Sequence, residues 1–104
     1  AAGDDLIGRI VALYVEHAPA ALDRLAAMQE AENPENIADC AHSLKSLSRN
    51  VGATRVGDMA NDIEICARDQ GHKPSPNQLT QLVEALDQTL EALKEVGKLQ
   101  ESAA

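Results

Sequence analysis

Apolar residues recur along the chain at helical spacing, in five segments separated by residues typical of turns. We expect helices over about 4–16, 19–31, 34–51, 54–70 and 76–97. Pro19 separates the first two segments, because proline suits the first turn of a helix better than its interior. No run of alternating apolar and polar residues appears, so no strand is predicted.

The sequences around two prolines are typical of helix starts. Asn33 can cap a helix that begins at Pro34. Ser75 and Gln78, on either side of Pro76, form the pattern of a capping box. Short connections between amphipathic helices favour antiparallel neighbours, so the pattern predicts an all-α, up-and-down antiparallel four-helix bundle. Segment 4–16 is then a short additional N-terminal helix laid across the bundle, and residues 1–104 form a single domain.

The composition agrees with a small helical protein and excludes some functions. Hydrophobic residues make up 44% of the chain and charged residues 25%, and Tyr14 is the single aromatic residue. The net charge of -8 repels a phosphate backbone, so nucleic-acid binding is not expected. No apolar run is long enough to span a bilayer, and no direct membrane contact is predicted. We expect a monomer.

Cysteine and histidine residues do not form a metal-binding pattern. The three histidines, His17, His42 and His72, are far apart in sequence, so no metal site is predicted. Cys40 and Cys66 lie in apolar helical patterns and are expected as buried thiols. A disulfide is disfavoured because packed helix axes lie about 8–10 Å apart, whereas a bridge needs Cα atoms within about 7 Å.

His42 lies outside the apolar stripe of its own predicted helix. At about 100° per residue, His42 points roughly 160° away from Leu44, a residue at the centre of the stripe. Lys45 lies near 100° and Arg49 near 140° on the same scale, and the small residues Ala38 and Ser46 are neighbours. The imidazole is therefore expected in solvent, with two cations beside it.

This combination of residues suits a phosphoryl group. An imidazole with the ordinary pKa of about 6.5 is mostly neutral near pH 7, so one ring nitrogen is a nucleophile. Lys45 and Arg49, three and seven residues further on, can meet anionic oxygens on a group attached to that nitrogen. No glycine-rich loop for a nucleotide is present. Another protein must therefore bring the phosphoryl group and remove it.

The stretch from His42 to Ala53, "HSLKSLSRNVGA", resembles the signature of histidine-containing phosphotransfer (HPt) domains of multistep two-component phosphorelays. The resemblance extends to the chain length and the helical pattern. It implies that His42 is the phospho-accepting residue and that Lys45 stabilises the charge of the phosphoryl group. Ser46 stands where the family usually has glycine. Its hydroxyl can hydrogen-bond the phosphoryl group or the ring, or it can narrow access for a partner.

Two further candidates follow from the turn between the third and fourth segments. If these helices reverse about residue 53, positions whose numbers sum to about 106 lie level with each other. This pairs His42 with Glu64 and Ala38 with Arg68. Both partners lie at the edge of their helix, about 100° and 140° from Ile63. Glu64 and Arg68 are therefore supporting site candidates, and a solvated rim is the alternative.

The function that the resemblance implies is that of a phosphorelay intermediate. It accepts a phosphoryl group on His42 from the phospho-aspartate of a receiver domain and passes it to the aspartate of another receiver. The domain itself needs no cofactor, and Mg²⁺ is expected in the partner receiver. Ile7, Val11 and Tyr14 are candidates for partner docking, because the first segment has more apolar residues than one core face requires.

Two other functions stay open from the sequence: an adaptor that binds receivers without being phosphorylated, and a structural helical bundle. The isolated domain is not expected to be an enzyme, because no ATP site is evident. We expect a cytoplasmic location, as a free-standing carrier or as the cytoplasmic domain of a membrane-bound hybrid sensor kinase. The sequence does not name the receivers or the signal.

Overall fold

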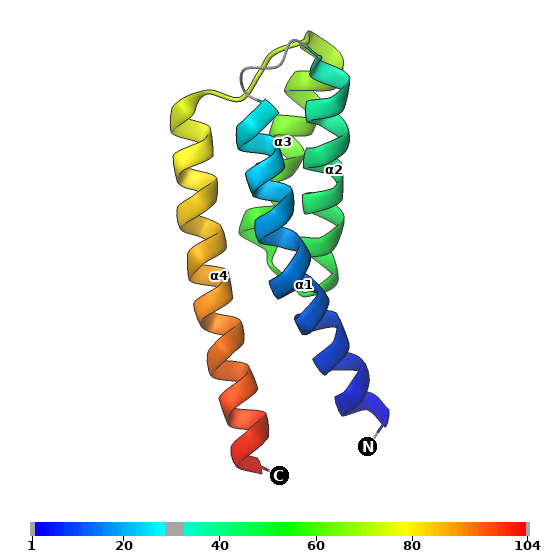
Figure 1. The fold of residues 1–104 in the computed structure, drawn as a ribbon, viewed down its shortest axis with the longest axis vertical. Helices are drawn as coiled ribbons and strands as arrows, with labels where there is room; N and C mark the ends of the chain where they lie inside the picture. Colours follow the sequence, from blue (N-terminus) through cyan, green and yellow to red (C-terminus); the bar gives the residue numbers. More distant parts are fainter. Residues whose placement is uncertain (1, 29–32, 104) are drawn as a thin grey trace.

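Four α-helices and no strand make up the described part of the chain. The computed structural model describes the backbone of residues 2–28 and 33–103, and the side chains of 6–28 and 33–95. The helices are α1 (Ala2–Ala27), α2 (Pro34–Asn50), α3 (Thr54–Gln70) and α4 (Pro76–Ala103). Consecutive helices alternate in direction along the long axis of the molecule (Figure 1).

The prediction of a separate N-terminal helix is wrong. Segment 4–16 and the first part of segment 19–31 belong to one continuous helix, α1, which contains Pro19 in its interior and ends at Ala27. Residues 29–31 of the second predicted segment lie outside the described residues. The packed face of α1 carries Tyr14, Ala18 and Leu25, all at most 1% exposed. Burial of this face offsets the backbone hydrogen bond that Pro19 cannot donate.

Several helix ends are confirmed by their hydrogen bonds. The Asn33 side chain accepts a bond from the Glu35 backbone N–H at 3.0 Å, with Pro34 at the first turn of α2. Ser75 Oγ accepts from the Gln78 N–H at 3.1 Å, and Gln78 Oε1 accepts from the Ser75 N–H at 2.9 Å, which completes the capping box before α4. Gly52, with φ 77°, lies in the turn between α2 and α3, a conformation that favours glycine.

The core lies between the helices and consists mostly of aliphatic side chains. Helices α2 and α3 form the most extensive contact of any pair. Small residues favour a close approach of packed helices. At Gly57 of α3, an added Cβ would lie 3.3 Å from Arg49 Cγ and 3.8 Å from Ser48 Cβ of α2. Other small residues buried on these two helices are Ala38, Ala41, Ala60 and Ala67. The hairpin of α2 and α3 is therefore a closely packed unit on which side chains can be positioned.

Both cysteines are free thiols; Cys40 is buried as expected, whereas Cys66 is only half-buried, so the expected burial of Cys66 is wrong. Cys40 Sγ donates a hydrogen bond to the Ala21 carbonyl at 3.1 Å, which ties α2 to α1. Burial raises the pKa of the Cys40 thiol above its ordinary value. The thiol therefore acts as a small core group.

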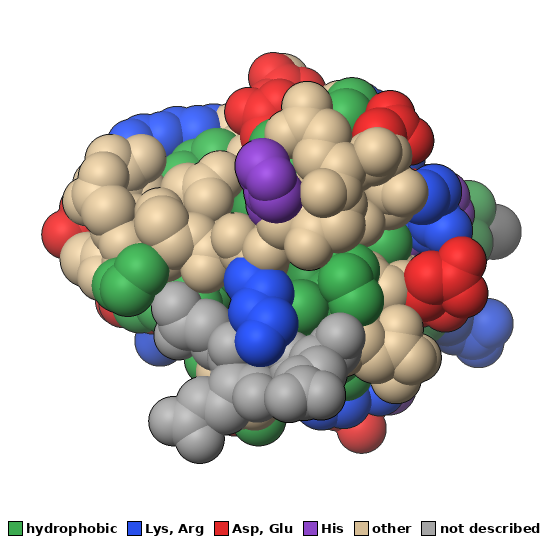
Figure 2. All heavy atoms as spheres, turned by 90° about the horizontal axis from the view of Figure 1, so that it is seen from above, with side chains coloured by type: hydrophobic (Ala, Val, Ile, Leu, Met, Phe, Trp, Pro, Cys, Tyr) green, Lys and Arg blue, Asp and Glu red, His purple; other side chains and the backbone are tan. Residues whose placement is uncertain are grey.

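Charged side chains are distributed over the surface. Figure 2 looks down onto the end of the bundle where α3 gives way to α4, and acidic, basic and uncharged side chains are mixed there outside the grey atoms. Within the described residues, no helix is both long enough and apolar enough to cross a bilayer.

Candidate functional site

His42 projects from the middle of α2 towards solvent, at the edge of the contact with α3. Leu44 and Ala41 are fully buried, whereas the His42 side chain is 55% exposed. The helical spacing of the apolar stripe explains this orientation, as the sequence predicted. Ala38, expected beside His42 on the solvated face, is instead fully buried because α3 packs closely over that edge of α2.

The hairpin brings Glu64 of α3 next to His42. His42 Nδ1 lies 3.0 Å from Glu64 Oε2, the level pairing that the turn near residue 53 predicted. The Glu64 side chain is only 12% exposed, so this hydrogen bond forms at the edge of the α2–α3 contact rather than in open solvent. One edge of the imidazole is held by α3 and the remainder of the ring is accessible.

The second oxygen of Glu64 binds Lys45. Lys45 Nζ lies 2.6 Å from Glu64 Oε1 and 3.4 Å from Asn61 Oδ1, and the lysine side chain is 15% exposed. Burial by itself would raise the pKa of Glu64. The hydrogen bonds and positive charges of Lys45 and His42 together outweigh burial and hold the pKa of Glu64 below its ordinary value. Glu64 is therefore an ionised carboxylate at neutral pH.

The charge of Glu64 determines which nitrogen of His42 carries the proton. An ionised carboxylate can only accept hydrogen bonds, so His42 Nδ1 must be the donor. In the neutral ring, Nε2 then has the free electron pair. Because Nδ1 is occupied by Glu64, the nitrogen with the free electron pair is Nε2, on the opposite edge of a side chain that is 55% exposed.

Arg68 of α3 bridges Glu64 and an exposed aspartate of α2. Its Nη2 atom lies 3.4 Å from Glu64 Oε2 and 3.3 Å from Asp39 Oδ1. The hydrogen bond to Asp39 is the largest influence on the Arg68 guanidinium and raises the pKa of Arg68. The structure thus brings His42, Lys45, Glu64 and Arg68 into one connected cluster, to which Asp39 is attached.

Arg49 and Ser46 lie along the same face of α2 but outside these hydrogen bonds. The stem of Arg49 lies over Gly57 of α3, where an added Cβ would be 3.3 Å from Arg49 Cγ. The absence of a side chain at Gly57 therefore makes room for Arg49. Ser46 is exposed one helical turn after His42.

The comparisons identify the family. The model of the Hpt domain matches residues 9–95, which is most of the chain. The chain belongs to the Hpt domain family. Hpt domains are phosphotransfer carriers that act on histidine in phosphorelays and interact with receiver domains of response regulators or hybrid kinases. No curated protein and no solved structure shows a significant match to the chain.

One of the predicted docking residues of this Hpt domain is not at the surface. Tyr14 is 1% exposed, and its hydroxyl lies 3.0 Å from Ser48 Oγ in the core. In one continuous helix, Tyr14 falls within about 20° of Leu25 and so faces the bundle. Ile7 is 47% exposed and Val11 half-buried, and both line a hollow of about 150 Å³ near the α2–α3 turn.

Sequence reasoning missed two residues that contact the candidate site. Asp39 was not selected as a partner of Arg68, and Asn61 was not selected as a partner of Lys45. The numbers 45 and 61 also sum to 106, so the level pairing contained this signal. Ile65, which follows Glu64 on α3, is an exposed apolar residue at 46% that sequence reasoning did not select as a docking candidate.

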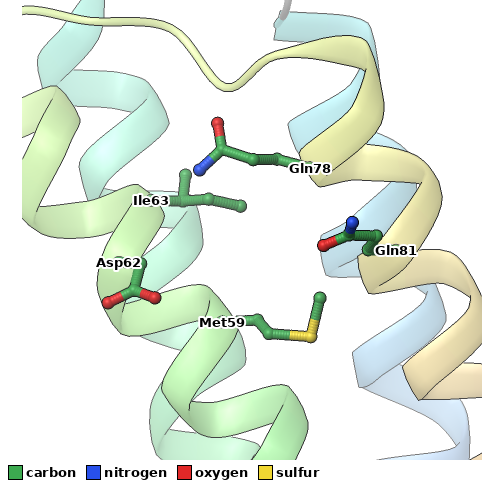
Figure 3. A pocket seen from close by; sticks show the side chains of 5 residues that line it. All are labelled: Met59, Asp62, Ile63, Gln78 and Gln81. Carbon is green, nitrogen blue, oxygen red and sulfur yellow. The ribbon is translucent and has the colours of Figure 1, made fainter.

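A small cavity between α3 and α4 is separate from this cluster. Figure 3 shows Met59 and Ile63 of α3 facing Gln78 and Gln81 of α4 around it. Its volume is about 100 Å³, and Asp62 is its one charged lining residue. Within the described residues, no three His, Cys, Asp or Glu side chains converge in a group suited to a metal ion.

Proposed function

We propose that this Hpt domain is a phosphorelay intermediate that accepts a phosphoryl group from a receiver phospho-aspartate on Nε2 of His42 and passes it to another receiver aspartate. The observation that supports this most directly is the hydrogen bond between His42 Nδ1 and Glu64. It keeps the proton on Nδ1 and leaves the lone pair on the accessible nitrogen.

The proposed transfer balances without a further reactant. The Nε2 lone pair attacks phosphorus in line, and the N–P bond forms while the P–O bond to the receiver aspartate breaks. The electron pair of that bond returns to the aspartate carboxylate. The Nδ1 proton stays in place, so the phosphorylated ring carries a positive charge beside the Glu64 carboxylate. Transfer to the second receiver reverses these steps.

Other residues of the cluster support the reaction in this proposal. Lys45 holds Glu64 in place and contributes positive charge to the site. Arg49, seven residues after His42 on α2, is proposed to approach the transferred group. The receiver supplies its own acidic pocket and Mg²⁺. Ile65, with Ile7 and Val11, offers exposed apolar area for docking. We also propose a cytoplasmic location and a monomeric state.

The test is transfer of labelled phosphate from a phosphorylated receiver. The wild-type domain should gain acid-labile, base-stable label, and His42→Gln should gain none because it lacks the nucleophilic nitrogen. His17→Gln and His72→Gln are matched controls, since both residues are exposed and outside the cluster, and each should be labelled like wild type. Equal labelling of wild type and His42→Gln would disprove the proposal. Receiver binding without labelling of wild type would favour the adaptor function.

A further inference from the structure

We infer that Asp39 sets the equilibrium of phosphoryl transfer by holding Arg68, the cation that would otherwise pair with the phosphoryl group on His42. This inference rests on the proposed function and adds a positioning residue to it. Its basis is the geometry of the shared Glu64 oxygen and the unequal exposure of the cations around the imidazole.

Arg68 lies next to the imidazole without binding it. Its Nη2 atom and His42 Nδ1 contact the same oxygen, Glu64 Oε2, at 3.4 and 3.0 Å. The guanidinium therefore shares a carboxylate oxygen with the Nδ1 edge of the ring, and its exposed head group would have to move around the ring to reach a phosphoryl group on Nε2. Arginine has five N–H donors in a planar fork, an arrangement that suits phosphoryl oxygens.

Lys45 is less free to move than Arg68. Its ammonium is bound to both Glu64 and Asn61, and its side chain is 15% exposed. Removing Lys45 from this position would leave the nearly buried Glu64 carboxylate poorly paired, which is costly. The Arg68 side chain is 43% exposed, so its head group can change partners in solvent at small cost.

Asp39 competes with the phosphoryl group for Arg68. Its carboxylate is 72% exposed and lies three residues before His42 on α2, on the same side of the helix. When a phosphoryl group is attached to His42, the Arg68 guanidinium can exchange Asp39 for phosphoryl oxygens. No covalent bond changes in this exchange: one ion pair is broken and another is formed. The Asp39–Arg68 pair therefore opposes phosphorylation of His42.

The experiment measures the equilibrium between the domain and one phosphorylated receiver, as the ratio of phosphorylated to free protein on each side. We expect Asp39→Asn to raise the ratio of phosphorylated to unphosphorylated domain about threefold at equilibrium. This is the size of effect that an exposed ion pair supports. Arg68→Ala should lower it. In the Arg68→Ala background, Asp39→Asn should give a smaller gain, because no ion pair is left to break and only direct repulsion is removed.

The comparison of the two backgrounds decides the inference. A gain from Asp39→Asn that is equal or larger in the Arg68→Ala background would overturn it. Asp69→Asn is the matched control, since Asp69 is an exposed carboxylate directly after Arg68. A gain from Asp69→Asn as large as that from Asp39→Asn would show a general charge effect and would also overturn it. If wild type takes up no label at all, the proposed function fails, and this inference fails with it.

Discussion

Glu64 is the residue that holds the cluster together, because its two oxygens have different partners. Oε2 accepts from His42 Nδ1 and Oε1 binds the Lys45 ammonium. One carboxylate thus sets the tautomer of His42 and neutralises a cation that is mostly shielded from water. Without Glu64, neither function has another residue to take it over within the hydrogen bonds described above.

Replacement of Glu64 should therefore slow transfer in a graded way. Glu64→Ala leaves Nδ1 without an acceptor and should lower the initial rate of labelling about tenfold, equivalent to about 1.4 kcal/mol. Glu64→Gln retains an oxygen that can accept from Nδ1–H and should stay within about threefold of wild type. The measurement is the initial rate from a phosphorylated receiver, with circular dichroism as the control for folding. Equal, large losses in both variants would assign the effect to the charge of Glu64 rather than to the tautomer.

At this scale the sequence predicted positions better than contacts. The reversal near residue 53 placed Glu64 level with His42, and the structure has that contact. The sequence did not show that Lys45 turns towards Glu64 or that Arg68 pairs with Asp39. These choices depend on side-chain rotamers at the edge of two packed helices, and helical periodicity does not specify rotamers. Tyr14 was assigned to the surface because α1 was divided into two helices.

Among the helices, α1 shows how a single residue can mislead a prediction. Pro19 suggested a break, yet α1 continues through it from Ala2 to Ala27. The packing of one continuous apolar face decides the outcome, since burial of several side chains exceeds the cost of one proline. The packed face of α1 runs from Tyr14 through Ala18 to Leu25, whereas Leu6 and Leu13 are exposed at 60% and 50%.

Replacement of Pro19 tests this explanation. In Pro19→Ala, the backbone N–H at position 19 can bond the carbonyl of Val15, and the clash of the ring is removed. We expect the free energy of unfolding to rise by about 1–2 kcal/mol, less than the full helix-interior cost because the unfolded chain also becomes more flexible. Urea denaturation measures the change. Pro76→Ala is the matched control, since Pro76 begins α4 and should show no gain. A gain of the same size at both positions would contradict the explanation.

For the molecule as a whole, the sequence predicted the helical class and the family correctly. The caps at Asn33 and Ser75 also showed where α2 and α4 begin, because capping is local and depends on a few neighbouring residues. The number of helices was wrong because the continuity of α1 depends on packing against residues that are distant in the sequence. The pairing of Glu64 with His42 is intermediate between these two cases. It is a contact between residues distant in the sequence, but a local feature, the turn near residue 53, determines it.

The ionisation of Glu64 should contribute to the stability of the whole fold. Its pKa is lower in the folded domain than the ordinary value of 4.5, so its contribution is fully present above about pH 4.5. The contribution is lost as the pH falls through the lower folded value, because protonation then favours the unfolded chain. The difference in unfolding free energy between wild type and Glu64→Gln should therefore shrink as the pH falls below the ordinary value of 4.5. Urea titrations at each pH measure it, and a constant difference would argue against the ion pairs described for Glu64.

The imidazole of His42 has one free edge, because α3 occupies the other through Glu64. A carrier built this way can be visited by one receiver at a time, so donor and acceptor must take turns. The relay would then follow ping-pong kinetics. An excess of unphosphorylated donor would inhibit it by occupying the receiver-binding surface around His42. The rate of phosphoryl flow through the domain would depend on the dissociation rate of each receiver as well as on the rate of the transfer step.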